Sequence, residues 1–311
     1  MTKKTARSGI AHRFRLDLRS NYDLYLMVIP GVLFYLLFKY WPMFGVQIAF
    51  RQYSPVLGIT GSPWVGFKWF ERFLNSAQFG SLMLNTFAIS IYSLLVGFPI
   101  PIILALLLNS AKSRGFMKTV QMVAYAPHFI STVVLVSMLN VFFGQTYGLV
   151  NNIAEQLGGE RVLYLGLPQY FRHMYVWSGV WQNMGWSSII YISALSGVSP
   201  ELHEAATVEG ANRFQRILHV DLPHIIPTAT ILLIMNCGQL LSVGFDKVYL
   251  MQNAQNIRHS QVLSTHVYEM GILKGQQSYA SAVDLFNSVI SFILLFTVNM
   301  ISRKIGETSL W

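Results

Sequence analysis

The chain has 311 residues, of which 53% are hydrophobic and 11% are charged, and its mean hydropathy is +0.45. Soluble domains carry about 25% charged residues, so this composition excludes an ordinary soluble protein and indicates a polytopic membrane protein. The net charge of +9 does not indicate nucleic acid binding, because the basic residues are dispersed and mostly lie at the edges of apolar segments. The single cysteine, Cys237, excludes an internal disulfide and a cysteine-based metal site.

Six apolar segments are long enough to cross a bilayer as helices, which takes about 20 residues each. They cover residues 24–40, 82–108, 119–143, 174–198, 225–243 and 283–301. The first follows basic residues as a signal peptide would, but it is too long and no small-residue cleavage site follows it. We therefore expect an all-α membrane protein with an N-terminal segment 1–23, a six-span domain 24–301 and a C-terminal tail 302–311.

The distribution of basic residues predicts the orientation of these spans. Thirteen of the 22 Lys and Arg residues lie in the short segments that share a side with the N-terminus, and nine lie in the longer segments opposite. The positive-inside rule therefore predicts that both termini and the loop 199–223 are cytoplasmic. The outer segments, near 44–80, 144–173 and 244–282, are either plain connectors or a lid or docking surface for an external partner. The middle one holds an amphipathic stretch, 149–157.

Two spans contain features that distort helices. Pro99 and Pro101 each remove a backbone donor from the second span, which predicts a bend or distorted turn there. His128 follows Pro127 in the third span, where we expect a neutral, packed or hydrogen-bonded group near a proline break.

The cytoplasmic loop 199–223 contains signals for two short helices. Ser199 and Pro200 form a typical helix start, and Gly210 suits the left-handed residue that ends a helix. Asn212 with Gln215 indicates a capping box that opens a second helix, which Leu222-Pro223 should end. The side chains expected to pack on the inner ends of the spans are Leu202, Ala205, Ala206, Phe214, Ile217 and Leu218.

Within this loop, Glu204-Ala205-Ala206, Gly210 after three residues, and Val220-Asp221-Leu222-Pro223 after nine more resemble the EAA motif of binding-protein-dependent ABC importer permeases. Val220 replaces the commoner isoleucine, and Glu209 stands where the family often has aspartate. Residues 190–198, 245–251, 285–290 and 309–311 resemble the carbohydrate-type permeases, particularly the complex-sugar and polysaccharide subgroup. The resemblance covers most of the chain beyond residue 20.

The resemblance implies a multi-pass permease of a bacterial cytoplasmic membrane that works within a larger complex. Its partners would be a second homologous permease, two ATPase subunits or an ATPase homodimer, and an extracytoplasmic solute-binding protein. The coupling residues would be Glu204, Ala205, Ala206, Gly210, Leu222 and Pro223. No phosphate-binding loop sequence occurs in the chain, so ATP and Mg²⁺ would be bound by the ATPase subunits, and the chain itself needs no cofactor or metal.

Aromatic faces and neutral amides recognise sugars, and three spans offer such groups. The candidate pathway residues are Trp181, Gln182, Asn183 and Trp186 in the fourth span, Asn236 and Gln239 in the fifth, and Asn287 in the sixth. Tryptophans also form interfacial belts, and buried amides also join helices, so a purely structural role stays open.

Three alternative functions differ in the residues that they require. An ion-coupled transporter usually places an acidic residue deep in a span, and no Asp or Glu lies in the middle of a predicted span here. An intramembrane enzyme needs a catalytic constellation that the spans lack. An ABC permease for amino acids or peptides stays open, because the EAA-like loop carries no information about the cargo.

Overall fold

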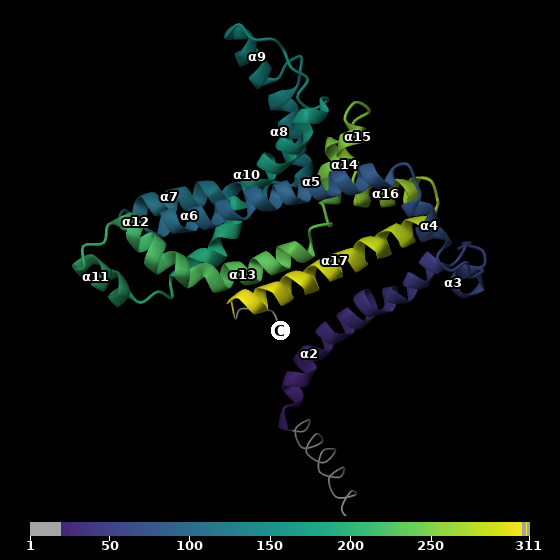
Figure 1. Ribbon diagram of the computed structural model, residues 1–311, viewed down its shortest axis with the longest axis horizontal. Coiled ribbons are helices and arrows are strands. Elements are labelled where there is room, and N and C mark those ends of the chain that lie inside the picture. Colours follow the sequence, from purple (N-terminus) through teal and green to yellow (C-terminus); the bar gives the residue numbers. More distant parts are fainter. Residues whose placement is uncertain (1–19, 307–308, 310–311) are drawn as a thin grey trace, which may run out of the picture. The chain divides into compact units, whose positions relative to one another are not determined.

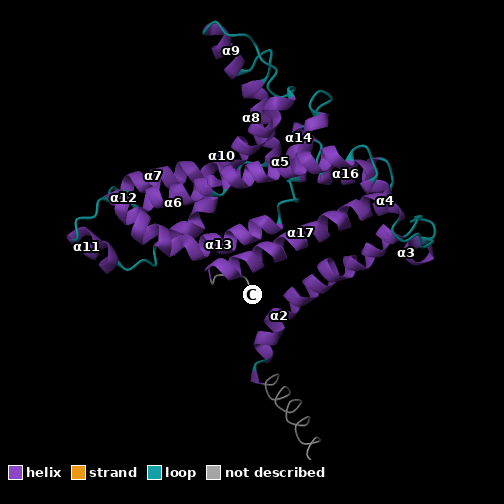
Figure 2. Cartoon of the chain, in the orientation of Figure 1, coloured by secondary structure: helices purple, strands orange, loops and turns teal. Residues whose placement is uncertain are grey.

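The computed structural model describes residues 20–306 and residue 309 of the chain. These residues form helices and connecting loops, and the described part contains two isolated β-bridges but no strand (Figure 2). The all-α prediction is confirmed for the described residues. The chain divides into two compact units, one ending at Phe67 and the other beginning at Lys68. The basic residues before residue 20 lie outside the described range.

The first unit is dominated by one long apolar helix, Tyr22–Phe50, which is long enough to cross a membrane and contains the first predicted span. It consists of α2 (Tyr22–Tyr35), a π-helical segment (Leu36–Tyr40) and a 3-10 segment (Trp41–Phe50), and the short α3 (Gly58–Gly61) follows. Arg51 fastens the turn after this helix. Its Nη1 donates hydrogen bonds to the carbonyl oxygens of Thr60 at 3.1 Å and Ser62 at 2.8 Å.

The second unit holds the remaining helices (Figure 1). Its first half contains α4 (Lys68–Leu74), α5 (Phe79–Gly97), α6 (Pro99–Asn109), α7 (Arg114–Tyr125), α8 (Thr132–Phe143), α9 (Leu149–Gln156) and α10 (Pro168–Leu195). Its second half contains α11 (Pro200–Val208), α12 (Arg213–Arg216), α13 (Leu222–Gly238), α14 (Phe245–Met251), α15 (Ile257–Ser260), α16 (Leu263–Tyr268) and α17 (Gln277–Gly306).

Among the described residues, four helices are long and apolar enough to cross a membrane: Tyr22–Phe50, Phe79–Asn109, Arg213–Gly238 and Gln277–Lys304. A bent pair, α7 with α8, would make a fifth. The 28 residues of α10 reach about 42 Å and are long enough, but the tryptophans and amides in the helix lower its hydropathy. A multi-pass helical membrane protein therefore agrees with the structure, while the number six stays a prediction.

The third predicted span, residues 119–143, is interrupted at the expected proline break. Helices Arg114–Phe129 and Thr132–Phe143 meet at an angle of 101°. Pro127 cannot donate a backbone hydrogen bond, and Ile130 and Ser131 are extended. Ser131 then caps a new helix, because its hydroxyl oxygen accepts the N–H of Val134 at 3.4 Å.

The fifth predicted span begins earlier than expected, and Leu222-Pro223 does not end the preceding helix. The helix runs without interruption from Arg213 to Gly238, so the predicted boundaries 225–243 are wrong at both ends. A π-helical turn, Ile217–Asp221, lies directly before the proline, and the N–H of Leu222 donates to the carbonyl of Ile217. Such a wide turn gives room for the proline ring that would clash in a regular α-helix.

Helix α10 is the centre of the second unit, because it packs against α5, α6, α7 and α13. Toward the loop 199–223, a buried cluster joins Ala105, Tyr191, Leu195 and Ile225. Toward the opposite ends of the helices, a second cluster includes Ile89, Val136, Phe171 and Val248. At Gly185 a Cβ atom would lie 2.1 Å from the carbonyl oxygen of Ala124, so only glycine permits this approach of α10 to α7.

Candidate coupling loop and solute pathway

The first helix of the loop 199–223 begins and ends as the sequence predicts. The Ser199 hydroxyl oxygen accepts the N–H of Glu201 at 3.3 Å, and Pro200 is the first helical residue. Gly210 has φ +83°. The N–H of Ala211 donates to Ala206 at 2.9 Å and that of Gly210 to Thr207 at 3.1 Å, which together form a Schellman motif.

The second helix of the loop opens with the predicted capping box. The backbone N–H of Asn212 donates to Oε1 of Gln215 at 2.7 Å, and the N–H of Gln215 donates to Oδ1 of Asn212 at 2.9 Å. The described loop therefore fixes both the turn at Gly210 and the direction in which the chain enters α12.

Helix α11 lies at one end of the second unit, beyond α12, and none of its residues is buried (Figure 1). Glu204 and Ala205 are exposed and Ala206 is half-buried. The expected packing of the loop's apolar side chains on the spans is wrong for Leu202 and Phe214, which are 55% and 71% exposed. Leu218 is exposed too, whereas Ile217 packs against the cluster around Ile225.

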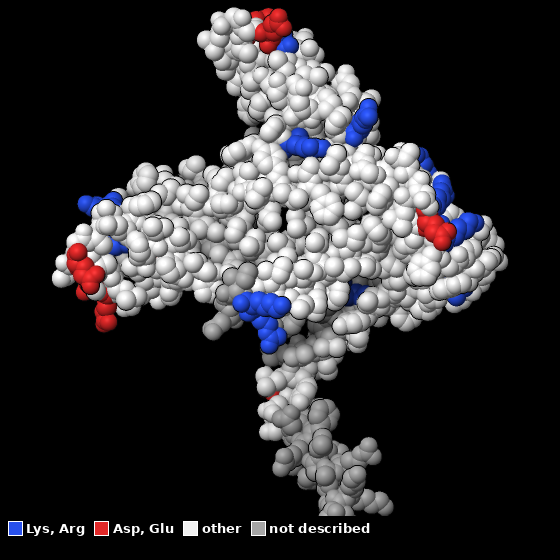
Figure 3. Space-filling view, viewed as in Figure 1, with Lys and Arg blue, Asp and Glu red and all other residues white. Residues whose placement is uncertain are grey.

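The loop therefore presents a mixed apolar and acidic surface to its surroundings. Val208, 88% exposed, adds to the apolar part. Glu201, Glu204 and Glu209 are exposed, and Figure 3 shows acidic side chains gathered where α11 lies. Leu222 and Pro223, by contrast, lie within the continuous helix Arg213–Gly238 and not on α11.

Asp221 links the loop to two spans, a role that its place in the motif alone did not indicate. Its side chain is 3% exposed, and Oδ1 lies 3.3 Å from Nε2 of His203 on α11. The side-chain amide of Asn109, at the end of α6, donates to the same oxygen at 3.2 Å. Arg216 adds a contact across the loop, because its Nη1 donates to the hydroxyl of Thr207 at 3.0 Å.

A cavity of about 690 Å³ lies between α10, α13, the α5 and α6 helices, and the residues after α13. Five of the seven predicted pathway residues line it: Gln182, Asn183, Trp186, Asn236 and Gln239. Trp181, which is 40% exposed, and Asn287 are not among the lining residues. Their role in a pathway stays a prediction.

On the α10 side of the cavity, three side chains contact the break between α7 and α8. The ring of Trp186 stacks on His128 with centroids 4.5 Å apart, and Nδ1 of His128 lies 3.0 Å from Oδ1 of Asn183. The Gln182 amide donates to the carbonyl of Ile130 at 2.7 Å. Gln182 therefore satisfies a backbone acceptor that the bend releases, which is a structural role beside any contact with solute.

The α13 side of the cavity is different, because its amides have no partner within the described chain. Asn236 and Gln239 are exposed to the cavity, and neither side chain forms a hydrogen bond there. They are placed to bind a polar solute. Asn287 is half-buried on α17, and its Oδ1 is buried without a hydrogen-bond partner.

Lys247 also lines this cavity, although the sequence placed it in an outer connection and indicated no role for it. It lies in the first turn of α14 and is 9% exposed. Its Nζ donates to the carbonyl oxygen of Tyr175 on α10 at 2.8 Å.

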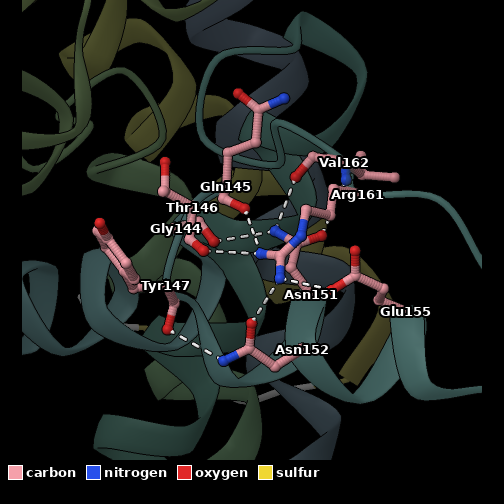
Figure 4. Close-up of polar contacts among 9 residues, drawn as sticks. All are labelled: Gly144, Gln145, Thr146, Tyr147, Asn151, Asn152, Glu155, Arg161 and Val162. Carbon is pink, nitrogen blue, oxygen red and sulfur yellow. Dashed lines mark hydrogen bonds and ion pairs between the residues drawn. The ribbon is translucent and has the colours of Figure 1, made fainter.

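The connection 144–167, which the sequence predicts to be on the outer side, is an organised structure, with α9 at the end of the arm that α8 begins (Figure 1). The Asn151 side chain donates to the carbonyls of Gly144 at 2.9 Å and Val162 at 3.0 Å, and its Oδ1 accepts the N–H of Val162 at 2.8 Å (Figure 4). The amphipathic stretch 149–157 forms the helix α9, which ends at Gln156.

Arg161 stabilises the same connection, because both terminal nitrogens of its guanidinium group donate hydrogen bonds. Nη1 donates to the carbonyls of Gln145 at 3.0 Å and Thr146 at 2.7 Å, and Nη2 donates to Glu155 at 2.6 Å (Figure 4). The hydrogen bond and charge of Arg161 hold the pKa of Glu155 below its usual value. The hydrogen bonds of Asn151 and Arg161 therefore hold the connection 144–167 in one conformation.

Comparison with known proteins identifies the family. Residues 97–306 match the model of the binding-protein-dependent transport system inner membrane component. The chain belongs to this family. It is thus a membrane permease component of a transport system and not itself an enzyme.

Several relatives match nearly the whole permease chain. Protein LplB of Bacillus subtilis (strain 168) is 42% identical over 99% of this chain and 96% of its own length. The polygalacturonan/rhamnogalacturonan transport system permease protein YteP of the same organism is 41% identical over 96% of this chain and 93% of its own.

Among solved structures, the permease resembles a chain of a bacterial ABC transporter involved in the import of the acidic polysaccharide alginate. The TM-score is 0.88, the identity is 37%, and 94% of this chain and 99% of that chain are covered. A second structure of an alginate ABC transporter, in complex with an alginate pentasaccharide-bound periplasmic protein, matches with TM-score 0.88 and 36% identity, covering 96% of this chain and 100% of that one.

Proposed function

We propose that this permease forms, with a second homologous permease, the translocation pathway of an ATP-driven importer for oligo- or polysaccharides. The observation that carries the proposal is the exposed helix α11, whose acidic and apolar side chains face away from the bundle. An apolar patch rimmed by polar groups is typical of a surface that binds another protein. Here that protein is an ATPase subunit.

The contacts of Asp221 support the transmission of force from the loop. His203 connects α11 to Asp221, and Asn109 connects Asp221 to the inner end of α6. A movement of α11 imposed by an ATPase would therefore reach two helices that border the cavity. The docking element for the ATPase would consist of Glu204, Ala205, Ala206 and Gly210. Leu222 and Pro223 would transmit the movement as part of the continuous helix Arg213–Gly238. ATP and Mg²⁺ would be bound by two partner ATPase subunits.

The proposed permease crosses a bacterial cytoplasmic membrane six times, with both termini in the cytoplasm. The four apolar helices, the bent α7 and α8 pair, and α10 would supply the six spans. Lining a solute pathway explains why α10 carries tryptophans and amides, since polar groups in a membrane are tolerated where they face a cavity or another helix. The organised connection 144–167 would then meet an extracytoplasmic solute-binding protein.

A carbohydrate is the proposed cargo because the cavity offers neutral amides and an aromatic ring, and because the relatives named above include polysaccharide permeases. Asn236 and Gln239 would bind hydroxyl groups, and Trp186 would contact a sugar face. Trp181, Gln182, Asn183 and Asn287 complete the proposed set, with Gln182 and Asn183 already held by the break between α7 and α8.

Purification and reconstitution test this function. The tagged chain should co-purify with an ATPase and a permease, and the reconstituted complex with its solute-binding protein should hydrolyse ATP faster when an oligosaccharide is present. A panel of oligosaccharides, amino acids and peptides identifies the cargo class. Stimulation by amino acids or peptides alone, or uptake driven by an ion gradient without ATP, would contradict the proposal.

A further inference from the structure

Lys247 occupies an unusual position for a lysine. It is 9% exposed, lines the cavity, and sits where α14 meets α10. Its Nζ is 2.8 Å from the Tyr175 carbonyl oxygen and 4.9 Å from the centre of the Tyr175 ring. The carbonyl dipole and the ring face orient the ammonium group, but neither carries a full negative charge.

No carboxylate compensates this ammonium group within the described part of the chain. Lys247 is the single charged side chain among the residues lining the cavity, and it forms no ion pair with a described residue. Buried lysines are almost always paired, and an uncompensated charge within a membrane protein is costly enough to indicate function. The missing negative charge is best supplied by a solute in the cavity.

The surroundings of Lys247 leave space for such a solute. Gly179 on α10 has no side chain, and a Cβ atom there would lie 3.2 Å from Nζ of Lys247. Asn236 and Gln239, which have no partner in the described chain, line the same cavity. A cation beside neutral amides matches a sugar that carries both a carboxylate and hydroxyl groups.

We propose that Lys247 binds the carboxylate groups of an acidic oligosaccharide in the cavity, so that the cargo of this permease is a uronic acid glycan. This inference rests on the proposed import of carbohydrates and specifies its substrate class. The contact would select acidic over neutral sugars of the same length, because a buried ammonium group loses its counter-charge when a neutral sugar takes the site.

A structural alternative assigns Lys247 only to the attachment of α14 to α10. The variant Lys247→Gln separates the two roles, since its amide can still donate to the Tyr175 carbonyl but carries no charge. Lys274→Gln is the matched control, because Lys274 is 52% exposed, pairs with Glu269 and does not line the cavity.

The probes are a short oligogalacturonide and its carboxyl-reduced counterpart, which differ in charge but not in length. Binding of each to the purified complex in lipid nanodiscs is measured by isothermal calorimetry without the solute-binding protein, and uptake is measured in proteoliposomes with that protein. Lys247→Gln should weaken binding of the acidic glycan about tenfold or more and change binding of the reduced glycan less than about twofold. Lys274→Gln should change neither.

Equal effects of Lys247→Gln on both glycans, or no effect on either, would overturn the inference. Should that variant fail to assemble, Gly179→Ala provides a second test, because it keeps the lysine and narrows the approach to its ammonium group. It should weaken acidic glycan binding several-fold and spare the reduced glycan. If the wild-type complex binds and transports neither glycan, the proposed carbohydrate function itself is wrong, which is a separate outcome.

Discussion

Nε2 of His203 lies 3.3 Å from Oδ1 of Asp221, and this contact joins the exposed helix α11 to a carboxylate that is 3% exposed. Eighteen positions along the chain, across the turn at Gly210, separate the two residues. The contact therefore joins the two helices of the loop 199–223. It fixes α11 relative to the N-terminal part of the helix Arg213–Gly238. Asn109 extends the link to α6.

Replacing Asp221 by leucine should weaken both the fold of the loop and its coupling to transport. The amide of Asn109 and the ring of His203 lose their common acceptor, and each lost hydrogen bond costs about 0.5–1.5 kcal/mol. We expect a lower melting temperature of the complex and less uptake per ATP hydrolysed. In a double-mutant cycle with His203→Ala, the two effects should not add. Additive effects would contradict a direct link.

Replacing Gly210 by valine should uncouple ATP hydrolysis from uptake and leave membrane insertion intact. Gly210 has φ +83°, which costs a residue with a side chain about 1–2 kcal/mol, and a β-branched residue more. Its Cβ would meet no atom within 4 Å, so the effect comes from the backbone alone. Gly210→Asn is the control, because asparagine tolerates this conformation. Normal uptake by the valine variant would refute the role of the turn.

Leucine at Asn236 or Gln239 should reduce uptake without changing the basal ATPase rate. Both amides face the cavity without a partner in the described chain, so their loss removes contacts to solute and leaves no protein group unsatisfied. Met235→Leu is the control, since this neighbour does not line the cavity. The measurement is uptake of labelled oligosaccharide at matched ATPase activity. Uptake equal to the wild type in both variants would exclude these residues from the pathway.

Replacing Arg161 by alanine should loosen the outer connection and weaken binding of the solute-binding protein. The change removes hydrogen bonds to the carbonyls of Gln145 and Thr146 and to the side chain of Glu155. Glu155→Gln should have a smaller effect, because the bonds to both carbonyls remain. Hydrogen exchange of residues 144–162 and binding measured by surface plasmon resonance provide the readouts. A loosened connection with unchanged binding would mean that this surface is not the docking site.

The loop was predictable from sequence because its signals are local. Serine at the helix start, glycine at the turn and the capping box each depend on residues a few positions apart, and all three are present in the structure. The end of the second helix was not predictable in this way. Pro223 suggested a stop, but the π-helical turn Ile217–Asp221 lets the helix continue into α13.

Contacts between distant segments explain most of what the sequence could not predict. The sequence predicted a proline break in the third span. It did not predict the angle of 101° or the hydrogen bond from Gln182 to the carbonyl of Ile130 at the bend, because Gln182 lies on another helix. Lys247 was placed in a connection, since only folding brings α14 against α10 and exposes the lysine to the cavity. The amides of the fifth span were recognised, because a polar pair in an apolar run is visible locally.

The helix Arg213–Gly238 connects the loop 199–223 to the cavity without leaving helical structure. Its 26 residues form a rod of about 39 Å. A tilt of about 5° at the end beside the loop 199–223 would displace the other end by about 3 Å, roughly the length of a hydrogen bond. Asn236 and Gln239 lie at that far end. A small rocking of this helix at the loop 199–223 would therefore shift both amides within the cavity.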